Sequence, residues 1–348
     1  MPKLPKYNKD GLHYDYAPIR SYNRIINFLI GARGCGKGYG FQEWCIRDFI
    51  ENDNQFVYMR RFKQELNKTK RQEFFDLKLQ EKYSDFKLGY NEKYGAWVIG
   101  DGTKTGDICG YPYILSSAGQ TKSGKEYQKV NKCCFDEFII DKQMYHYLPD
   151  EVGAFEEATV SIARDRFCQF FLLSNAMTWN NPYFVKFRIE FPDTDEVVAT
   201  PAYALHKPSM KAYAEYMMST PLGKTWASLD PEYADYAYYN QSLRDTTDFI
   251  AQRPKKTYFL FTFIINSRPI GVWIDEYGMN LYCSDKYDPY SRLKFTVKKE
   301  DHGEGLKLMA RNTPTLKSFV KRYMDSQVFF EDGIIKSLIE DFVCKTIR

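Results

Sequence analysis

Short apolar segments alternate with longer amphipathic ones along the first half of this chain. Four runs rich in Ile, Val, Phe, Leu and Cys have the length and character of buried strands: residues 25–30, 56–59, 133–135 and 170–173. Apolar side chains recur at helical spacing between residues 41 and 50, and residues 149–163 are also helix-prone. Strands that alternate with helices predict a mostly parallel sheet with helices on both faces.

Other segments of the first two thirds of the chain have different patterns. Residues 1–22 are polar and contain proline, so we expect a loosely held arm. Between residues 86 and 115, short aromatic pieces alternate with glycine-rich turns, which predicts hairpins inserted into the main sheet. Residues 118–131 are polar and predict an exposed loop, whereas residues 207–245 predict a small helical connector.

A second domain is predicted beyond residue 257. Residues 258–266, 270–275 and 279–283 are expected to form strands, and residues 316–347 one or two amphipathic helices. The expected domain boundaries are therefore 1–206, 207–245 and 246–348.

The first apolar run leads directly into Gly31-Ala32-Arg33-Gly34-Cys35-Gly36-Lys37, the G-x-x-x-x-G-K spacing of a phosphate-binding loop. Glycines let backbone N–H groups curl around phosphates, and the following helix directs its positive end at the same anion. Lys37 adds a charge for the β- and γ-phosphates. Gly38 stands where a Ser or Thr hydroxyl would bind Mg²⁺. The sequence therefore predicts a nucleotide site over residues 31–38 and leaves the hydrolysis rate open.

Polar residues also follow the two later strands. Asp136 and Glu137 would hold Mg²⁺ and polarise the attacking water, although two acids after a strand are common by chance. Asn175 would orient water near the γ-phosphate or simply close a turn. Ligands of parallel sheets lie beyond the carboxyl ends of the strands, where we expect these residues and Lys37 to meet.

Basic residues offer further candidates. Arg164 could reach the γ-phosphate of a neighbouring subunit, or be a solvated surface charge. Arg33 could bind phosphate or pair with an acid outside the loop. A group of basic residues at or after strand ends could line a pore and touch a phosphate backbone: Arg60, Arg61, Lys63, Lys122, Lys125 and Lys142.

Composition adds few constraints. The net charge of +4 means that any surface for nucleic acid must be local. The eight cysteines have no C-x-x-C pair or zinc-like spacing, which fits free thiols in a reducing compartment. No apolar run reaches the roughly 18 residues of a membrane span, and the N-terminus lacks a signal-peptide core. We therefore expect a soluble intracellular protein.

Together these motifs resemble those of the DNA-packaging ATPases of phi29-like phages. The similar segments are residues 24–37, 58–63, 135–139, 173–176, 181–184 and 271–275, so the resemblance spans nearly the whole chain. It implies an α/β P-loop NTPase of the ASCE motor type, a helical linker, and an α+β C-terminal domain resembling a degenerate RNase H-type nuclease.

The resemblance also implies a function and partners. Such proteins resemble ring ATPases, usually homopentamers, that use ATP and Mg²⁺ to drive double-stranded DNA through the portal into a preformed capsid. They work in the host cell cytoplasm, transiently at the portal vertex, and in some relatives a structural RNA links the ring to the capsid. By position, Arg164 matches a trans-acting arginine and Lys122 a second basic residue across the subunit interface, while Lys63 and Lys142 match pore contacts to DNA.

Two alternatives remain open on the sequence. Gly38 could leave a nucleotide-dependent DNA- or capsid-binding protein with little turnover. Alternatively, Asp275, Glu276, Asp285 and Asp288 could supply metal ligands to an active C-terminal nuclease, as in a two-part terminase. The first strand of that domain carries no acid, which favours a non-catalytic role in binding nucleic acid or a scaffold.

Overall fold

The computed structural model describes residues 4–5, 11–100, 106–117, 127–140, 147–148, 150–175, 181–189, 194–240, 249–265, 267–296, 307–309 and 313–347. The chain divides into two compact units, Met1–Thr178 with Phe191–Arg244, and Trp179–Glu190 with Asp245–Arg348. The connector that we expect as a domain of its own, residues 207–245, thus lies almost wholly within the first unit.

A nine-stranded sheet forms the centre of the first unit, in the order β3-β4-β5-β2-β6-β7-β1-β9-β8. The strands from β5 to β9 in this order are mutually parallel, which confirms the mostly parallel sheet. The hairpin of β3 and β4 extends one edge of the sheet antiparallel, as the glycine-rich pattern predicts. The strand bounds are Ile26–Ile30 (β1), Gln55–Arg60 (β2), Lys87–Asn91 (β3), Ala96–Gly100 (β4), Asp107–Ile114 (β5), Val130–Asp136 (β6), Gln169–Ser174 (β7), Val198–Ala199 (β8) and Tyr203–His206 (β9).

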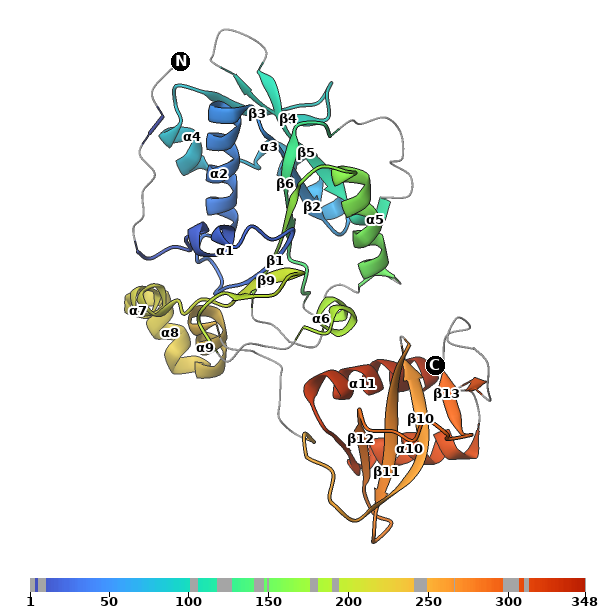
Figure 1. The fold of residues 1–348 in the computed structure, drawn as a ribbon. Helices are drawn as coiled ribbons and strands as arrows, with labels where there is room; N and C mark the ends of the chain where they lie inside the picture. Colours follow the sequence, from blue (N-terminus) through green and yellow to red (C-terminus); the bar gives the residue numbers. More distant parts are fainter. Residues whose placement is uncertain are drawn as a thin grey trace. The chain divides into compact units, whose positions relative to one another are not determined.

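Helices cover both faces of this sheet, with α2 on one side and α5 on the other (Figure 1). Phe41, Cys45 and Ile46 of α2 are fully buried, as its helical spacing predicts. The helices α7 to α9 gather beside β9 (Figure 1). The helix bounds are Ala17–Ser21 (α1), Lys37–Asn52 (α2), Lys68–Gln72 (α3), Leu77–Lys82 (α4), Glu151–Ala163 (α5), Lys211–Ser219 (α7), Pro221–Leu229 (α8) and Pro231–Tyr239 (α9), with 3₁₀ turns at Lys63–Leu66 and Leu115–Ser117.

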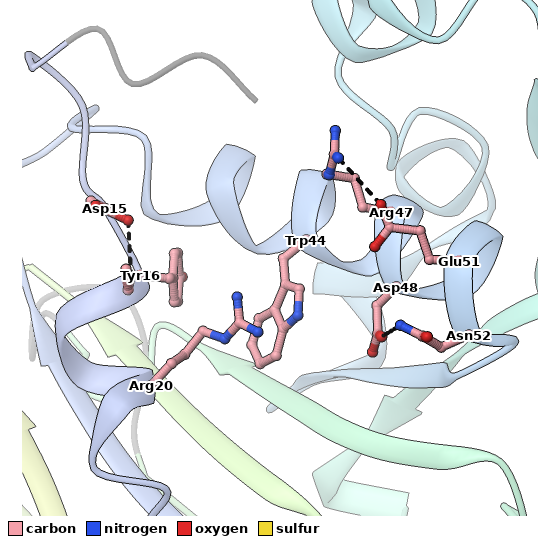
Figure 2. Close-up of a pocket in the computed structure, with 9 residues that line it drawn as sticks. Asp15, Tyr16, Arg20, Trp44, Arg47, Asp48, Glu51 and Asn52 are labelled. Atoms are coloured by element: carbon pink, nitrogen blue, oxygen red, sulfur yellow. Dashed lines mark hydrogen bonds and ion pairs between the residues drawn. The ribbon is translucent and has the colours of Figure 1, made fainter. Parts of the chain in front are cut away.

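The described part of the N-terminal segment, residues 11–22, is not the loosely held arm that its polar composition suggests. Tyr14, Tyr16 and Ile19 are buried. The Tyr16 hydroxyl donates a 2.7 Å hydrogen bond to the Lys37 carbonyl, and the Arg20 guanidinium lies 4.0 Å from the centre of the Trp44 ring (Figure 2). Aromatic rings spaced two residues apart thus attach this segment to α2, a contribution that average polarity conceals.

The second unit is built on a six-stranded sheet in the order β14-β13-β10-β11-β12-β15. Strands β10, β11 and β12 form an antiparallel meander, and β13 and β14 continue parallel to β10, as in RNase H-type sheets. The sequence predicts the three long strands but not the three-residue strands, which are too short to show a period. The bounds are Thr257–Ile265 (β10), Arg268–Asp275 (β11), Leu281–Ser284 (β12), Lys294–Thr296 (β13), Lys307–Met309 (β14), Val328–Phe330 (β15), Pro182–Phe187 (α6), Pro314–Met324 (α10) and Gly333–Ile347 (α11).

Two further expectations concern the described residues as a set. Seven cysteines among them are free and buried, as their spacing suggests. Within the described part of the chain, no helix has both the length and the apolar character needed to cross a membrane.

A buried ion pair joins three elements of the first unit. Arg61, just after β2, binds Glu151 at the start of α5 through two bonds of 2.6 and 2.7 Å. Its other donors reach the carbonyls of Glu137 and Phe138, which follow β6. Arg61 and Glu151 are 1% and 0% exposed, so Arg61 cannot contact DNA as the sequence suggests.

Replacing Glu151 by Gln should destabilise the first unit by about 3–5 kcal/mol, because the Arg61 charge would stay buried without its carboxylate. Changing both residues to apolar ones of similar size, Arg61→Met with Glu151→Leu, should cost less than either single change. Urea unfolding of the native chain, Glu151→Gln, Arg61→Met, Glu151→Leu and the double variant measures these differences. A double variant as unstable as the sum of the singles would contradict this account.

Candidate nucleotide-binding site

The phosphate loop connects β1 to α2 and has the backbone that its glycines predict. Gly34 and Gly36 have φ of 76° and 86°, the left-handed region that favours glycine. A Cβ on Gly34 would lie 2.7 Å from the Tyr213 hydroxyl, so space as well as conformation requires glycine there. Gly36 is the N-cap of α2 and has no side chain to cap this 16-residue helix, whose N-terminal end attracts anions.

Lys37 is 8% exposed, and its ammonium group is fully hydrogen-bonded. It donates to the carbonyls of Gly31 and Ala32, both at 2.8 Å. It also donates to Asn175 Oδ1 at 3.0 Å. Asn175 follows β7, so the lysine of the loop and the polar end of the adjacent strand meet as the sequence predicts.

Asp136 and Glu137 lie at the same edge of the sheet. Register pairs Ile30 of β1 with Ser174 of β7, and Leu173 with Asp136 of β6. The acids are therefore two strand spacings from the loop strand, about 10 Å. With β7 between β1 and β6, the strand order is that of ASCE-type NTPases. This spacing leaves room for phosphates between Lys37 and the acids.

Both acids are bound by Arg60, the last residue of β2. Its guanidinium donates to Asp136 at 2.9 Å, to Glu137 at 2.7 Å and to Glu65 at 3.1 Å. Burial alone would lower the pKa of Arg60, but the nearby Asp136 carboxylate and its neighbours raise it above its usual range. With its side chain 12% exposed and engaged by three carboxylates, Arg60 does not fit the DNA contact expected from the sequence.

The two carboxylates differ in their surroundings. Asp136 Oδ2 also accepts a 2.5 Å hydrogen bond from the Tyr58 hydroxyl, whereas Oδ1 accepts none from the described residues. Glu137 has a side chain 57% exposed and a left-handed backbone with φ of 59°. Asp136 is thus held in place, whereas Glu137 is accessible to solvent.

Arg164 lies at the end of the sheet where the parallel strands begin, opposite the end that carries the phosphate loop. It ends α5, which returns to the start of β7, and its neighbour Arg166 donates to the carbonyl of Val130 at the beginning of β6. Arg164 is exposed, and its side chain forms no hydrogen bond with the described residues. Within this chain it is therefore placed away from the phosphate loop.

The remaining candidates are placed as follows. Lys63 and Arg33 are exposed. Lys122 and Lys142 lie outside the described residues, as does Lys125. The roles expected of these residues remain predictions.

Contacts from the connector to the phosphate loop were missed in the sequence. The Tyr213 hydroxyl of α7 donates to the Arg33 carbonyl at 2.9 Å. The Arg33 N–H donates to the Ala237 carbonyl of α9 at 3.0 Å, and the Asn240 amide donates to the Ile30 carbonyl at 2.9 Å. These partners lie about 180 or more residues along the chain from the loop, a separation at which local pattern carries no signal.

In the second unit, Asp275 has a structural role. Its carboxylate accepts hydrogen bonds from the N–H groups of Met279 and Asn280 and from the Asn280 side chain, which closes the turn between β11 and β12. Across the described ranges of the chain, no three His, Cys, Asp or Glu residues are grouped to hold a metal ion. The hydrogen bonds of Asp275 argue against its use as a metal ligand, the role that the terminase alternative gives it.

A separate cavity of about 360 Å³ lies between α1 and the second half of α2 (Figure 2). Charges of both signs line it, and Arg47 pairs with Glu51 within it at 3.2 Å. Trp44, which lines this cavity, lies two turns along α2 from Lys37. The cavity is therefore distinct from the phosphate loop.

Two comparisons of sequence place this chain among known proteins. The model of the family described as podovirus DNA encapsidation protein (Gp16) matches residues 8–347. The DNA packaging protein of Bacillus phage phi29 is 29% identical over 337 residues, which cover 94% of this chain and 96% of that protein. The DNA packaging protein of Bacillus phage B103 is 30% identical over 322 residues, with 91% and 96% covered.

Solved structures agree with the sequence comparisons. A chain of the bacteriophage phi29 viral genome packaging motor assembly superposes with a TM-score of 0.75 at 27% identity, covering 96% of this chain and 99% of that one. The N-terminal domain of the phi29 DNA packaging ATPase gives a TM-score of 0.51 at 31% identity, covering 57% and 98%. With nearly its whole length matched, the chain belongs to the podovirus DNA encapsidation protein (Gp16) family.

Proposed function

We propose that this protein is an ATP hydrolase that drives double-stranded DNA through the portal into a preformed viral capsid. The observation that carries this proposal is the convergence of Lys37, Asn175 and the Asp136–Glu137 pair at one edge of the sheet. Phosphate donors, a polar group for water and two acids are the parts that phosphoryl transfer to water requires.

The reaction would use these groups in distinct ways. Backbone N–H groups of residues 31–38 and the Lys37 ammonium bind the phosphates, and Lys37 leaves the loop carbonyls to do so. Glu137 accepts a proton from the attacking water, which Asn175 helps to orient. For this, the 2.7 Å contact between Arg60 and Glu137 must open, while Asp136 keeps its bonds to Arg60 and Tyr58.

The site has a donor set that suits a magnesium ion shared with the nucleotide. Asp136 Oδ1 accepts no hydrogen bond from the described residues, and Gly38 adds no side-chain oxygen. Mg²⁺ commonly takes one carboxylate, substrate phosphates and several waters. When bound, it would neutralise charge that develops on the phosphate oxygens.

Arg164 would complete the site of a neighbouring subunit. Its position at the end of the sheet where the parallel strands begin supports action across an interface, since its own phosphate loop lies at the other end. We therefore infer a homo-oligomeric ring, a pentamer by resemblance, with Lys122 as a second basic group at the interface. Lys63 and Lys142 would contact the DNA backbone in the pore, and the second unit would bind nucleic acid or a scaffold without cleaving it.

The setting of this activity follows from the same proposal. The ring would act in the cytoplasm of the host cell and bind the portal vertex of the procapsid while DNA enters. In some relatives a structural RNA joins the ring to the capsid, and such an RNA is a partner to test for here.

The second candidate function is a nucleotide-dependent binding protein with little turnover. Gly38 favours it, because glycine offers Mg²⁺ no hydroxyl ligand. A Cβ added at Gly38 would meet no atom within 4 Å, so larger residues fit at this position.

Gly38→Ser should increase DNA-stimulated ATP hydrolysis and lower the Mg²⁺ concentration for half-maximal activity by roughly tenfold, because the hydroxyl adds a metal ligand. Gly38→Ala is the matched control, since it improves the helix without the hydroxyl. Steady-state hydrolysis over a Mg²⁺ series measures both. If the native chain and Gly38→Ser both bind ATP and neither hydrolyses it with DNA present, the motor hypothesis is wrong.

Arg164→Ala should lower hydrolysis by about 10³-fold or more, as expected for an arginine that acts in trans. Lys37→Ala should be inactive as well. Mixing the two variants should restore part of the activity, because a Lys37→Ala subunit can lend Arg164 to an intact phosphate loop beside it. The double variant mixed with Arg164→Ala is the control and should restore none. Absence of complementation in assembled mixtures would place Arg164 outside the reaction.

Lys63→Ala should weaken DNA binding equally for different sequences and reduce the dependence of affinity on salt, because each lost phosphate contact lowers the slope of log affinity against log salt by about one. Lys78→Ala, an exposed lysine on α4, is the control. Binding titrations at several salt concentrations test this, and an unchanged slope would remove Lys63 from the DNA interface.

A further inference from the structure

The phosphate loop is held from outside by the connector, residues 207–245. Its described part includes α7 to α9 and Asn240, which caps the end of α9. The loop and this described part both belong to the first compact unit. Three successive contacts reach the loop backbone: Asn240 to the Ile30 carbonyl, Ala237 to the Arg33 N–H, and Tyr213 to the Arg33 carbonyl. The connector therefore binds the segment on either side of Gly31 and Ala32.

Between these contacts lie two carbonyls that accept hydrogen bonds from the Lys37 ammonium, which is expected to move when nucleotide binds. Lys37 occupies the carbonyls of Gly31 and Ala32. When Lys37 turns to a phosphate, those two carbonyls lose their ammonium partner, whereas the flanking peptide groups remain bound to the connector. The backbone of Gly31 and Ala32 must then rearrange, or the connector residues that hold Ile30 and Arg33 must move with it.

Tyr213 is one of the connector residues that hold the loop backbone. It is 5% exposed, and its hydroxyl lies 2.7 Å from the position that a Cβ on Gly34 would take. A change in the backbone at Arg33 or Gly34 would therefore press on the ring or break its hydrogen bond, because protein interiors have little free space.

Asn240 is the second connector residue that holds the loop backbone through its side chain. It is 1% exposed and has a left-handed backbone with φ of 60°. Its amide donates to the Ile30 carbonyl and, at 3.5 Å, to the Pro208 carbonyl. The buried Oδ1 has no partner among the described residues, so these donations are what hold the side chain.

We propose that Tyr213 and Asn240 are positioning residues through which the connector senses the nucleotide in the phosphate loop. The proposal rests on the proposed function only in that residues 31–38 bind nucleotide. Coupling of this kind is reciprocal, so loosening the connector must also weaken nucleotide binding.

Hydrogen exchange of the full chain, with and without Mg²⁺ and a slowly hydrolysed ATP analogue at saturating concentration, tests the proposal. Nucleotide should slow exchange in residues 31–38 and also in α7 and α9, the latter by about fivefold or more. Exchange in the loop reports binding, and exchange in the connector reports coupling.

Two conservative variants separate coupling from stability. Tyr213→Phe removes one hydroxyl, and Asn240→Asp keeps shape and the left-handed preference but cannot donate to Ile30. Each should raise the dissociation constant of the analogue about fivefold and abolish the response of the connector, while the loop is still protected at saturation. Tyr216→Phe, an exposed tyrosine on the same helix, should behave as the native chain.

The outcomes are distinct. A merely structural role would speed exchange in the variants equally with and without nucleotide and would leave the response intact, which would overturn the proposal. So would a native connector that does not respond while the loop is protected. If the loop itself is not protected, the proposed function fails and the inference with it.

Discussion

Arg61 and Glu151 form an ion pair with almost no access to water, and the end of the sheet that carries Asp136 and Glu137 is built around it. Removing two charges from water is costly, so such a pair is stable only when its remaining donors are also satisfied. Here they are satisfied by the carbonyls of Glu137 and Phe138. The pair thereby fixes the backbone that carries the acidic residues and ties it to β2 and α5.

The neighbouring residue, Arg60, completes this arrangement from the exposed side. Consecutive residues at a strand end point in different directions, and so one arginine enters the interior while the other meets Asp136 and Glu137. One cation holds the backbone of the acids and the other neutralises their side chains. Two adjacent carboxylates can stay close together because this positive charge lies between them.

The phosphate loop is constrained in a similar way from three directions. Lys37 binds it from within, Asn175 meets that lysine from β7, and Tyr213 and Asn240 bind it from the connector. The N-terminal segment adds a further contact, the hydrogen bond from Tyr14 N–H to the Cys35 carbonyl. A loop with four glycines would lose much conformational entropy on ordering, and these contacts oppose that loss.

The sequence by itself determined the phosphate loop, the strand before this loop, the strand before Asp136, and the helix that begins at Lys37. Glycine spacing and apolar periodicity are local, so they are readable without tertiary structure. It could not separate Arg60 from Arg61, detect the burial of residues 14–19, or place the connector against the loop. Those features depend on which side chains meet across distant parts of the chain, and only the packed sheet, through its register and its buried charges, decided them.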